Sequence, residues 1–298
     1  MEQLKQLLTA AGIAYKENEP LAAHCTFKIG GPARLFVQPA DRAQLCRAVA
    51  LCKAQGVRHY LLGNGSNILF ADEGYNGAVL DISSMQDTVE VHGSQLTAGA
   101  GVRLSALCKT ALEHGLTGLE FAYGIPGTVG GAVYMNAGAY GGEMKDVLTT
   151  VQYLTAEGEI KEAAATELDL RYRHSIFEEN GGCILSAQFT LTPGEPEAIR
   201  AKMDELMAKR LDKQPLDKPS AGSTFKRPAG AFAAALIDQC GLRGYRHGGA
   251  AVSEKHCGFV VNLGGATCAD VLALCEEVRA IVKEKTGYDL EKEIRVVR

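Results

Sequence analysis

Apolar residues recur at helical spacing in some stretches of the chain and at strand spacing in others. Residues 2–12 place Leu4, Leu7 and Leu8 on one face, which predicts an amphipathic helix. Alternating or short apolar runs predict strands at 34–38, 58–62, 79–82, 88–92, 95–100, 147–154, 159–163, 183–191, 258–262 and 293–297. Helices and strands therefore mix along the whole chain, which indicates an α+β fold.

Capping residues mark several helix ends. Asp41 can cap a helix that runs to about residue 55, where Gly56 is placed to stop it. Thr267 and Asp270 have the spacing of a capping box for a long helix near the C-terminus. Further helices are predicted at 104–114, 196–211 and 231–239.

The pattern changes after residue 192. The run Pro193-Gly194-Glu195-Pro196 precedes a charged helix, and residues 213–219 form a polar linker that contains proline. We therefore expect three parts: an N-terminal helix over 1–20, a first domain over 21–192 and a smaller C-terminal domain over 193–298.

Two glycine-rich segments predict a bound cofactor. The stretch from Gly124 to Glu143, GIPGTVGGAVYMNAGAYGGE, has seven glycines, which suits a backbone that lies very close to a flat ligand. The run Gly63-Asn64-Gly65-Ser66-Asn67 follows a predicted strand, where backbone N–H groups could converge on phosphate oxygens. It is neither a Walker loop nor the dinucleotide fingerprint, and a plain Asn-Gly turn is the alternative.

Composition narrows the class of protein. The 298 residues are 46% hydrophobic with a net charge of −4, which argues against bulk nucleic-acid binding. No apolar run approaches the roughly 20 residues that span a bilayer, and the N-terminus lacks a secretory pattern, so we expect no membrane contact and a cytoplasmic location. The nine cysteines show no C-x-x-C and no metal-ligand spacing, which favours reduced core cysteines and no metal.

Ordered motifs carry a resemblance to a known family. Thr26-x-x-x-Gly30-Gly31-x-Ala33, GNGSNIL and the stretch from Gly124 to Glu143 resemble the FAD domain of the vanillyl-alcohol-oxidase type. Three further motifs, YRHSIF (172–177), PSAGSTFK (219–226) and LEKEIR (290–295), resemble the UDP-N-acetylenolpyruvoylglucosamine reductase family. The resemblance covers the chain from about residue 20 onward. The compact segment between 177 and 219 is similar to the shorter type of the family, which lacks a tyrosine-loop insertion.

The resemblance implies a fold and a cofactor. It implies a two-lobed FAD-binding domain and a smaller α/β substrate-binding domain. Neither glycine-rich segment contains a histidine for covalent attachment, so FAD is expected to be dissociable. The residues implied to bind it are Gly63, Asn64, Gly65, Ser66, Asn67, Ile68, Gly124, Ile125, Pro126, Gly127, Thr128, Gly130, Gly131, Ala132, Asn136 and Gly138.

The resemblance also implies a reaction and three catalytic residues. NADPH would reduce FAD, and hydride would pass to the enolpyruvyl ether of UDP-N-acetylglucosamine enolpyruvate, giving UDP-N-acetylmuramate for peptidoglycan synthesis. Arg173 would hold the substrate carboxylate, Ser223 would donate a proton to carbon, and Glu293, with a raised pKa, would help to stabilise the enediolate-like intermediate. Without the motif match, the same residues read as a surface arginine, a turn hydroxyl and an exposed residue in a charged tail.

Other substrate contacts and two other function classes complete the sequence-based predictions. Tyr172, Lys226, Arg227 and His256 are expected at the substrate, the middle two at its diphosphate, although a solvated loop histidine is the alternative for His256. A flavin oxidase that uses molecular oxygen and a nucleotide-binding module without redox chemistry are the alternative functions. A monomer is expected, with a weak homo-oligomer as the alternative.

Overall fold

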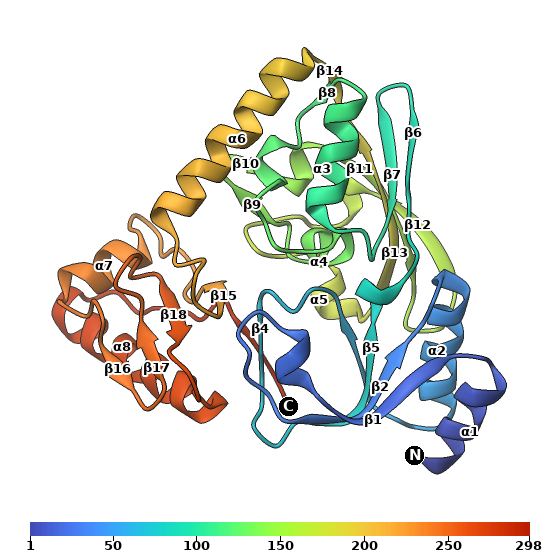
Figure 1. Ribbon diagram of the computed structural model, residues 1–298, viewed down its shortest axis with the longest axis horizontal. Coiled ribbons are helices and arrows are strands. Elements are labelled where there is room, and N and C mark those ends of the chain that lie inside the picture. Colours follow the sequence, from blue (N-terminus) through green and yellow to red (C-terminus); the bar gives the residue numbers. More distant parts are fainter. The chain divides into compact units, whose positions relative to one another are not determined.

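The structure is a computed structural model that describes residues 1–298, and its chain forms two compact units made of interleaved segments (Figure 1). Unit 1 consists of residues 1–16, 36–64 and 77–210. Unit 2 consists of residues 17–35, 65–76 and 211–298. The predicted division at residue 192 stays a prediction. A four-stranded sheet has the strand order β1-β2-β5-β3, and β3 (His59–Leu62) is parallel to β5. Each of its other three strands begins in one unit and ends in the other: β1 (Ala14–Pro20), β2 (Pro32–Gln38) and β5 (Tyr75–Asp81).

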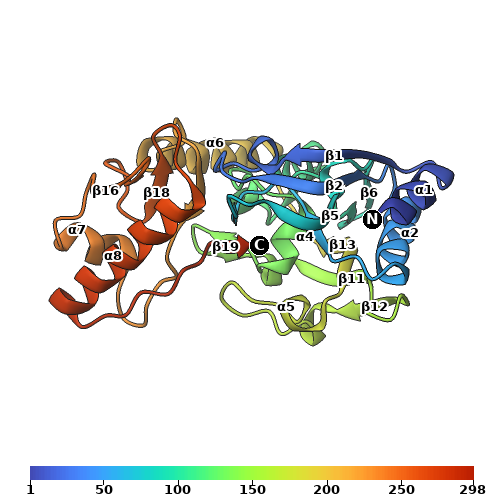
Figure 2. The same cartoon turned by 90° about the horizontal axis from the view of Figure 1, so that it is seen from below.

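Unit 1 is built on a five-stranded antiparallel sheet (Figure 2). Its strands, in spatial order, are β12 (Ile160–Ala164), β11 (Leu148–Leu154), β13 (Cys183–Thr190), β7 (Gln95–Gly99) and β6 (Val89–His92). The short helix α4 (Val129–Tyr134) contacts β13 and β7, and its buried Val129 and Val133 contribute to the core. The remaining helices are α1 (Glu2–Ala10), α2 (Arg42–Ala54), α3 (Leu104–Glu113), α5 (Phe177–Asn180) and α6 (Pro196–Lys213), whose last residues belong to unit 2.

Short strand pairs complete unit 1. They are β8 (Leu116–Thr117) with β14 (Thr192–Pro193), and β9 (Gly138–Ala139) with β10 (Gly142–Glu143). The second pair lies inside the glycine-rich stretch predicted to line a ligand, and α4 lies there too.

Unit 2 contains a four-stranded antiparallel sheet covered by a long helix. The strands follow the order β15 (Ser220–Ser223), β18 (Phe259–Asn262), β17 (Ala250–Val252) and β16 (Arg246–His247). Helix α8 (Cys268–Thr286) packs on β16 and β17 and also contacts α7 (Ala233–Gln239) (Figure 1). A separate parallel pair joins β4 (Ile68–Phe70) to β19 (Arg295–Val297).

Several predicted helix ends are confirmed. The Asp41 carboxylate accepts a hydrogen bond from Gln44 N at 2.8 Å, and Gly56 is left-handed with φ 59°. Thr267 and Asp270 form the predicted capping box of α8. The strands predicted at 88–92 and 95–100 are present as β6 and β7, which pair with each other and are joined by a turn at Gly93-Ser94.

Other features were not predicted. Strand β1 was missed because its sequence, AYKENEP, is polar and mostly exposed and so lacks an apolar alternation. Residues 220–223, interpreted as a possible turn, form strand β15 instead. All nine cysteines are free thiols and eight of them are buried, in agreement with their predicted place in the core. No helix has the length and apolarity needed to cross a membrane, and no cluster of histidine, cysteine and acidic side chains could hold a metal ion.

Candidate active site

In unit 1 the start of the first glycine-rich segment, Gly63-Asn64, lies against the second segment. The Asn64 side chain donates a hydrogen bond to the Pro126 carbonyl at 2.7 Å. A Cβ added to Gly63 would lie 2.6 Å from Thr128 Oγ1, so this position has no room for a side chain. Thr128 in turn caps α4, because its hydroxyl accepts from Gly131 N at 3.4 Å. The first two residues of the loop after β3, Gly63 and Asn64, are therefore packed against residues 126–128 of the glycine-rich stretch.

Some glycines of this stretch are required by close packing against other segments of the protein. A Cβ at Gly130 would lie 3.0 Å from the Cβ of Ala100, one at Gly138 would lie 2.6 Å from a backbone oxygen, and one at Gly142 would lie 2.6 Å from the Phe121 ring. These glycines allow close packing between protein segments. The sequence-based reason, close approach to a ligand, is therefore not needed for them.

Two glycines have no such internal reason. A Cβ at Gly127 would meet nothing nearer than 3.6 Å, and one at Gly131 nothing nearer than 3.5 Å. Their φ angles also lie outside the left-handed region. At these two positions the backbone conformation does not require glycine, and the space beside the backbone is open. A bound cofactor would explain the glycines, because a side chain there would occupy the space that the cofactor needs. These residues fit FAD.

Arg173 lies at the tip of a tight turn in unit 1. Arg171 and His174 exchange two backbone hydrogen bonds of 3.3 and 3.2 Å, which leaves Tyr172 and Arg173 as the central residues. Arg173 has a φ of 56°, which is unusual for a residue with a side chain. Its guanidinium donates to the Gly138 carbonyl at 3.2 Å and lies 5.0 Å from the centre of the Tyr172 ring. The turn thus holds the predicted carboxylate-binding side chain beside the glycine-rich stretch.

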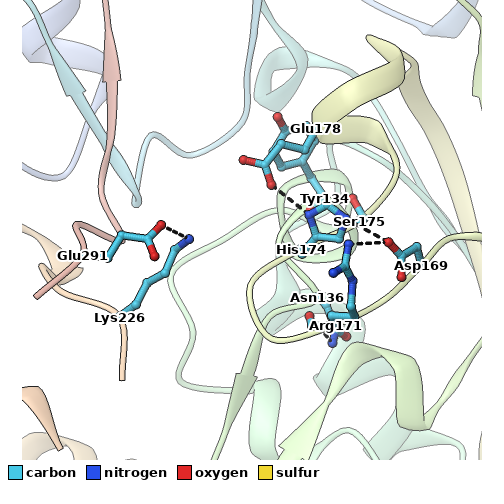
Figure 3. Close-up of polar contacts among 9 residues, drawn as sticks. All are labelled: Tyr134, Asn136, Asp169, Arg171, His174, Ser175, Glu178, Lys226 and Glu291. Atoms are coloured by element: carbon cyan, nitrogen blue, oxygen red, sulfur yellow. Dashed lines mark hydrogen bonds and ion pairs between the residues drawn. The ribbon is translucent and has the colours of Figure 1, made fainter. Parts of the chain in front are cut away.

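Buried Asn136 fixes this turn (Figure 3). Its Nδ2 donates to Glu143 Oε2 at 2.6 Å and to the Arg171 carbonyl at 3.0 Å, and its Oδ1 accepts from Lys145 N at 2.9 Å. The amide is therefore occupied by protein partners. Asn136 was predicted to bind the cofactor, and these contacts make it a residue that positions the loop carrying Arg173.

Charged pairs brace the outer side of the same turn (Figure 3). Asp169 accepts from Arg171 at 2.6 Å and contacts His174 at 3.2 Å, and His174 also contacts Glu178 at 3.2 Å. The Arg171 hydrogen bond is the largest cause that lowers the pKa of Asp169. Ser175, fully buried, donates to the Tyr134 carbonyl at 2.7 Å and ties the end of the turn to α4.

In unit 2, Ser223 and Glu293 lie on neighbouring strands of the backbone. Glu293 N donates to the Thr224 carbonyl at 2.8 Å, and Phe225 pairs with Lys292 in an antiparallel bridge. Ser223 is exposed and Glu293 is half-buried. The pairing aligns Glu293 with Thr224, the residue that follows Ser223, and so brings together two segments that lie about 70 positions apart in sequence.

Three further predicted motifs meet in the same part of unit 2. The Thr26 hydroxyl donates to the Ser220 carbonyl at 2.6 Å, and Thr26 N donates to the Gly65 carbonyl at 3.2 Å. Asn67 Nδ2 donates to the Glu293 carbonyl at 3.3 Å. The second half of the loop after β3 is thus hydrogen-bonded to the segments that carry Ser223 and Glu293.

The predicted diphosphate contacts have protein partners of their own. Lys226 Nζ lies 2.5 Å from Glu291 Oε1 (Figure 3), and Lys226 N donates to the Glu291 carbonyl at 2.8 Å. The Arg227 guanidinium lies over the exposed Phe232 ring at 4.5 Å. A bound diphosphate would have to exchange the Glu291 carboxylate for its own oxygens at Lys226.

His256 is half-buried and not a fully solvated loop residue. Its Nδ1 accepts a hydrogen bond from Gly258 N at 3.1 Å, so the neutral ring carries its proton on Nε2. The ring also stacks edge-on against Phe259 at 5.1 Å, and Phe259 is the partner of Ser223 in the β15–β18 pairing. Burial lowers the pKa of His256, which keeps the ring neutral near pH 7 as a single N–H donor.

Sequence reasoning missed one charged residue in unit 1. Arg210 continues the buried face of α6, which is formed by Ile199, Met203 and Leu206 at spacings of four and three residues. Its stem lies against Gly124, where an added Cβ would be 3.0 Å from Arg210 Cδ. An arginine in line with an apolar helical face was the signal that could have identified it.

The structure thus assembles two sets of predicted residues. Arg173 lies with the glycine-rich stretch in unit 1, whereas Ser223, Glu293, Lys226 and His256 lie in unit 2.

Comparison with known proteins identifies the domains. The family described as UDP-N-acetylenolpyruvoylglucosamine reductase, C-terminal domain, matches residues 214–297, and the family described as FAD binding domain matches residues 33–164. The expected cofactor class and the expected α+β fold, with an FAD-binding domain and a second C-terminal domain, are confirmed by these matches.

Similar proteins cover nearly the whole chain. The UDP-N-acetylenolpyruvoylglucosamine reductase of Agathobacter rectalis is 49% identical, over 99% of this chain and 96% of its own length. The reductase of the same name from Clostridioides difficile is 45% identical, over 95% of this chain and 93% of its own length. The crystal structure of the reductase from Thermus caldophilus superposes with a TM-score of 0.81 at 35% identity, over 96% of this chain and 99% of that one. The chain therefore belongs to the UDP-N-acetylenolpyruvoylglucosamine reductase family.

Proposed function

We propose that this flavoprotein reduces UDP-N-acetylglucosamine enolpyruvate to UDP-N-acetylmuramate, with NADPH as reductant, in the cytoplasmic stage of peptidoglycan precursor synthesis. The names of its relatives, which cover almost the full chain, support the reaction. The FAD-binding domain supports the cofactor. NADPH follows from the family resemblance.

FAD, when bound, supplies the hydride that reaches the terminal vinyl carbon of the substrate. The electron pair of the double bond then moves toward the carboxylate, and the adjacent carbon must receive a proton. Arg173 pairs with the carboxylate oxygens and offsets this charge. Ser223 donates the proton, and Glu293 stabilises the intermediate by hydrogen bonding.

One observation carries the residue assignment. The backbone pairing of the segment after β15 with the segment before β19 sets Glu293 beside Thr224, which follows Ser223 in sequence. An acid and its helper must act in the same region of the site, so the nearness of these two segments supports their joint role. The braced turn under Arg173 supports the third assignment, because a bidentate carboxylate contact needs a fixed guanidinium.

Replacement of Ser223 by alanine tests the mechanism. The variant should bind FAD and be reduced by NADPH without oxygen, seen as bleaching of the flavin absorbance, but it should then fail to transfer the electrons to substrate. Ser94→Ala is the matched control, because Ser94 lies in the hairpin between β6 and β7 and its backbone carbonyl makes the contact there. Normal turnover in Ser223→Ala would remove this residue from the mechanism. A wild-type protein without flavin, or one that consumes oxygen in place of the enolpyruvyl substrate, would contradict the proposed function itself.

A further inference from the structure

The basic side chains of helix α6 differ in whether they form ion pairs. On its exposed side, Lys202 lies 2.9 Å from Glu205 and Lys209 forms a short ion pair with the same carboxylate. The guanidinium of Arg210, the next residue, makes no hydrogen bond and no ion pair within the protein. No acidic residue stands three or four positions from it on the helix.

The unpaired guanidinium is not a freely hydrated surface charge. Arg210 is half-buried on the face of α6 that also carries Met203 and Leu206. Its stem packs on the backbone of Gly124, and the Met207 side chain approaches the same glycine, 3.7 Å from where its Cβ would stand. Burial lowers the pKa of the guanidinium, and Tyr140 is the one residue that acts in the opposite direction. An arginine nevertheless stays charged at neutral pH.

Such an arrangement is unfavourable in the protein alone. A partly desolvated cation that lacks a partner destabilises the fold, and an apolar or neutral polar side chain would be preferred on this face. The position near the C-terminal end of α6 explains a positive charge, since the helix dipole favours one there, but it does not explain burial. Exposed Lys209 already provides that favourable interaction.

We propose that Arg210 is a cofactor-binding residue that pairs with an anionic group of FAD. The inference rests on the proposed function in one respect, namely that FAD is the resident cofactor. Arg210 contacts Gly124, the first residue of the stretch that fits the cofactor, so an anion bound there lies within reach of an arginine side chain. The anion is either the diphosphate or the flavin ring, which gains negative charge on reduction.

A binding role and a structural role of Arg210 predict opposite changes in the melting temperature of the flavin-free protein. In the flavin-stripped full chain, Arg210→Gln should raise the melting temperature, because it removes an unpaired, partly buried charge. In the flavin-loaded protein the same change should lower it relative to the wild type. Arg200→Gln, at an exposed position of the same helix, should leave both temperatures unchanged. A lower melting temperature of Arg210→Gln without flavin would overturn the proposal, since it would show that the side chain acts in packing.

Titration of the stripped protein with FAD measures the binding role directly. A charge-assisted hydrogen bond lost on Arg210→Gln should weaken FAD affinity about 10- to 100-fold, with partial recovery in Arg210→Lys. Equal weakening for oxidised and reduced FAD assigns the diphosphate. Weakening confined to the reduced form assigns the ring, and then the midpoint potential falls by about 30 mV for each tenfold change. Unchanged affinity and potential would overturn the proposal, whereas a wild-type protein that fails to bind FAD would instead contradict the proposed function.

Discussion

Replacement of Arg173 by glycine should yield a more stable protein than replacement by alanine, although both variants should lose turnover. Arg173 occupies the second central position of the turn from Arg171 to His174 with a φ of 56°. Glycine adopts this conformation without steric cost, and alanine does not. Both changes remove the same side-chain contacts, including the bond to the Gly138 carbonyl, so their difference isolates the backbone.

The size of the difference follows from two opposing terms. The left-handed conformation costs a residue with a Cβ roughly 1–2 kcal/mol. Glycine reduces this advantage by about 0.4–1 kcal/mol, because it increases the conformational entropy of the unfolded chain and so stabilises the unfolded state. Arg173→Gly should therefore exceed Arg173→Ala in unfolding free energy by about 1 kcal/mol, or roughly 2–4 °C in melting temperature.

Thermal melts of both variants, saturated with FAD, provide the measurement. Arg200 supplies the control, because it lies inside helix α6, where glycine should be about 1 kcal/mol less stable than alanine, the opposite sign. Activity assays should show losses of about 100-fold or more in both Arg173 variants, since the carboxylate loses its charged partner. Equal stability of the Arg173 pair would refute the strained turn. Near-normal turnover would refute the role of its side chain.

Three further changes test the supports of the site. Asn136→Ala should cost about 3 kcal/mol in urea unfolding, because it removes all three hydrogen bonds of a buried amide, whereas exposed Asn76→Ala should cost almost nothing. A small loss would show that the turn does not depend on this amide. The folded-state pKa of His256 is lowered below its ordinary value of 6.5, so between the two pKa values the unfolded chain binds more protons than the folded chain. The resulting stability is present above about pH 6.5 and lost as the pH falls, and His256→Gln should flatten this slope between pH 7 and pH 5 in chemical unfolding. An unchanged slope would contradict the neutral ring. Thr267→Ala should cost about 1 kcal/mol through loss of the α8 capping box, and an unaltered urea midpoint would argue against it.

Local physics made much of the fold predictable. Asp41 and Thr267 cap their helices because a short side-chain oxygen at that position satisfies a free N–H group wherever the chain turns helical. The hairpin at Gly93-Ser94 follows for a similar reason, since turn residues separate two alternating runs. Strand β1 could not be predicted from such local rules. Its sequence has no strand pattern, and it is a strand because it pairs with β2.

The candidate site was less predictable because its residues depend on distant partners. Asn136 looks like a ligand contact in sequence, but its hydrogen bonds go to Glu143, Lys145 and Arg171. Several glycines that suggest a ligand are in fact required by neighbouring protein atoms, as at Gly142 beside Phe121. The neighbourhood of Ser223 and Glu293 exists only through pairing across a long stretch of chain, and no local pattern encodes it.

The interleaved units have a consequence for synthesis and folding. Strand β19, at the end of the chain, pairs with β4, whose residues are made more than 200 positions earlier. During synthesis, β4 therefore leaves the ribosome long before its partner strand is made, so this pair cannot form early in folding. Until then β4 remains an unpaired edge, which is a site for aggregation and for chaperone binding.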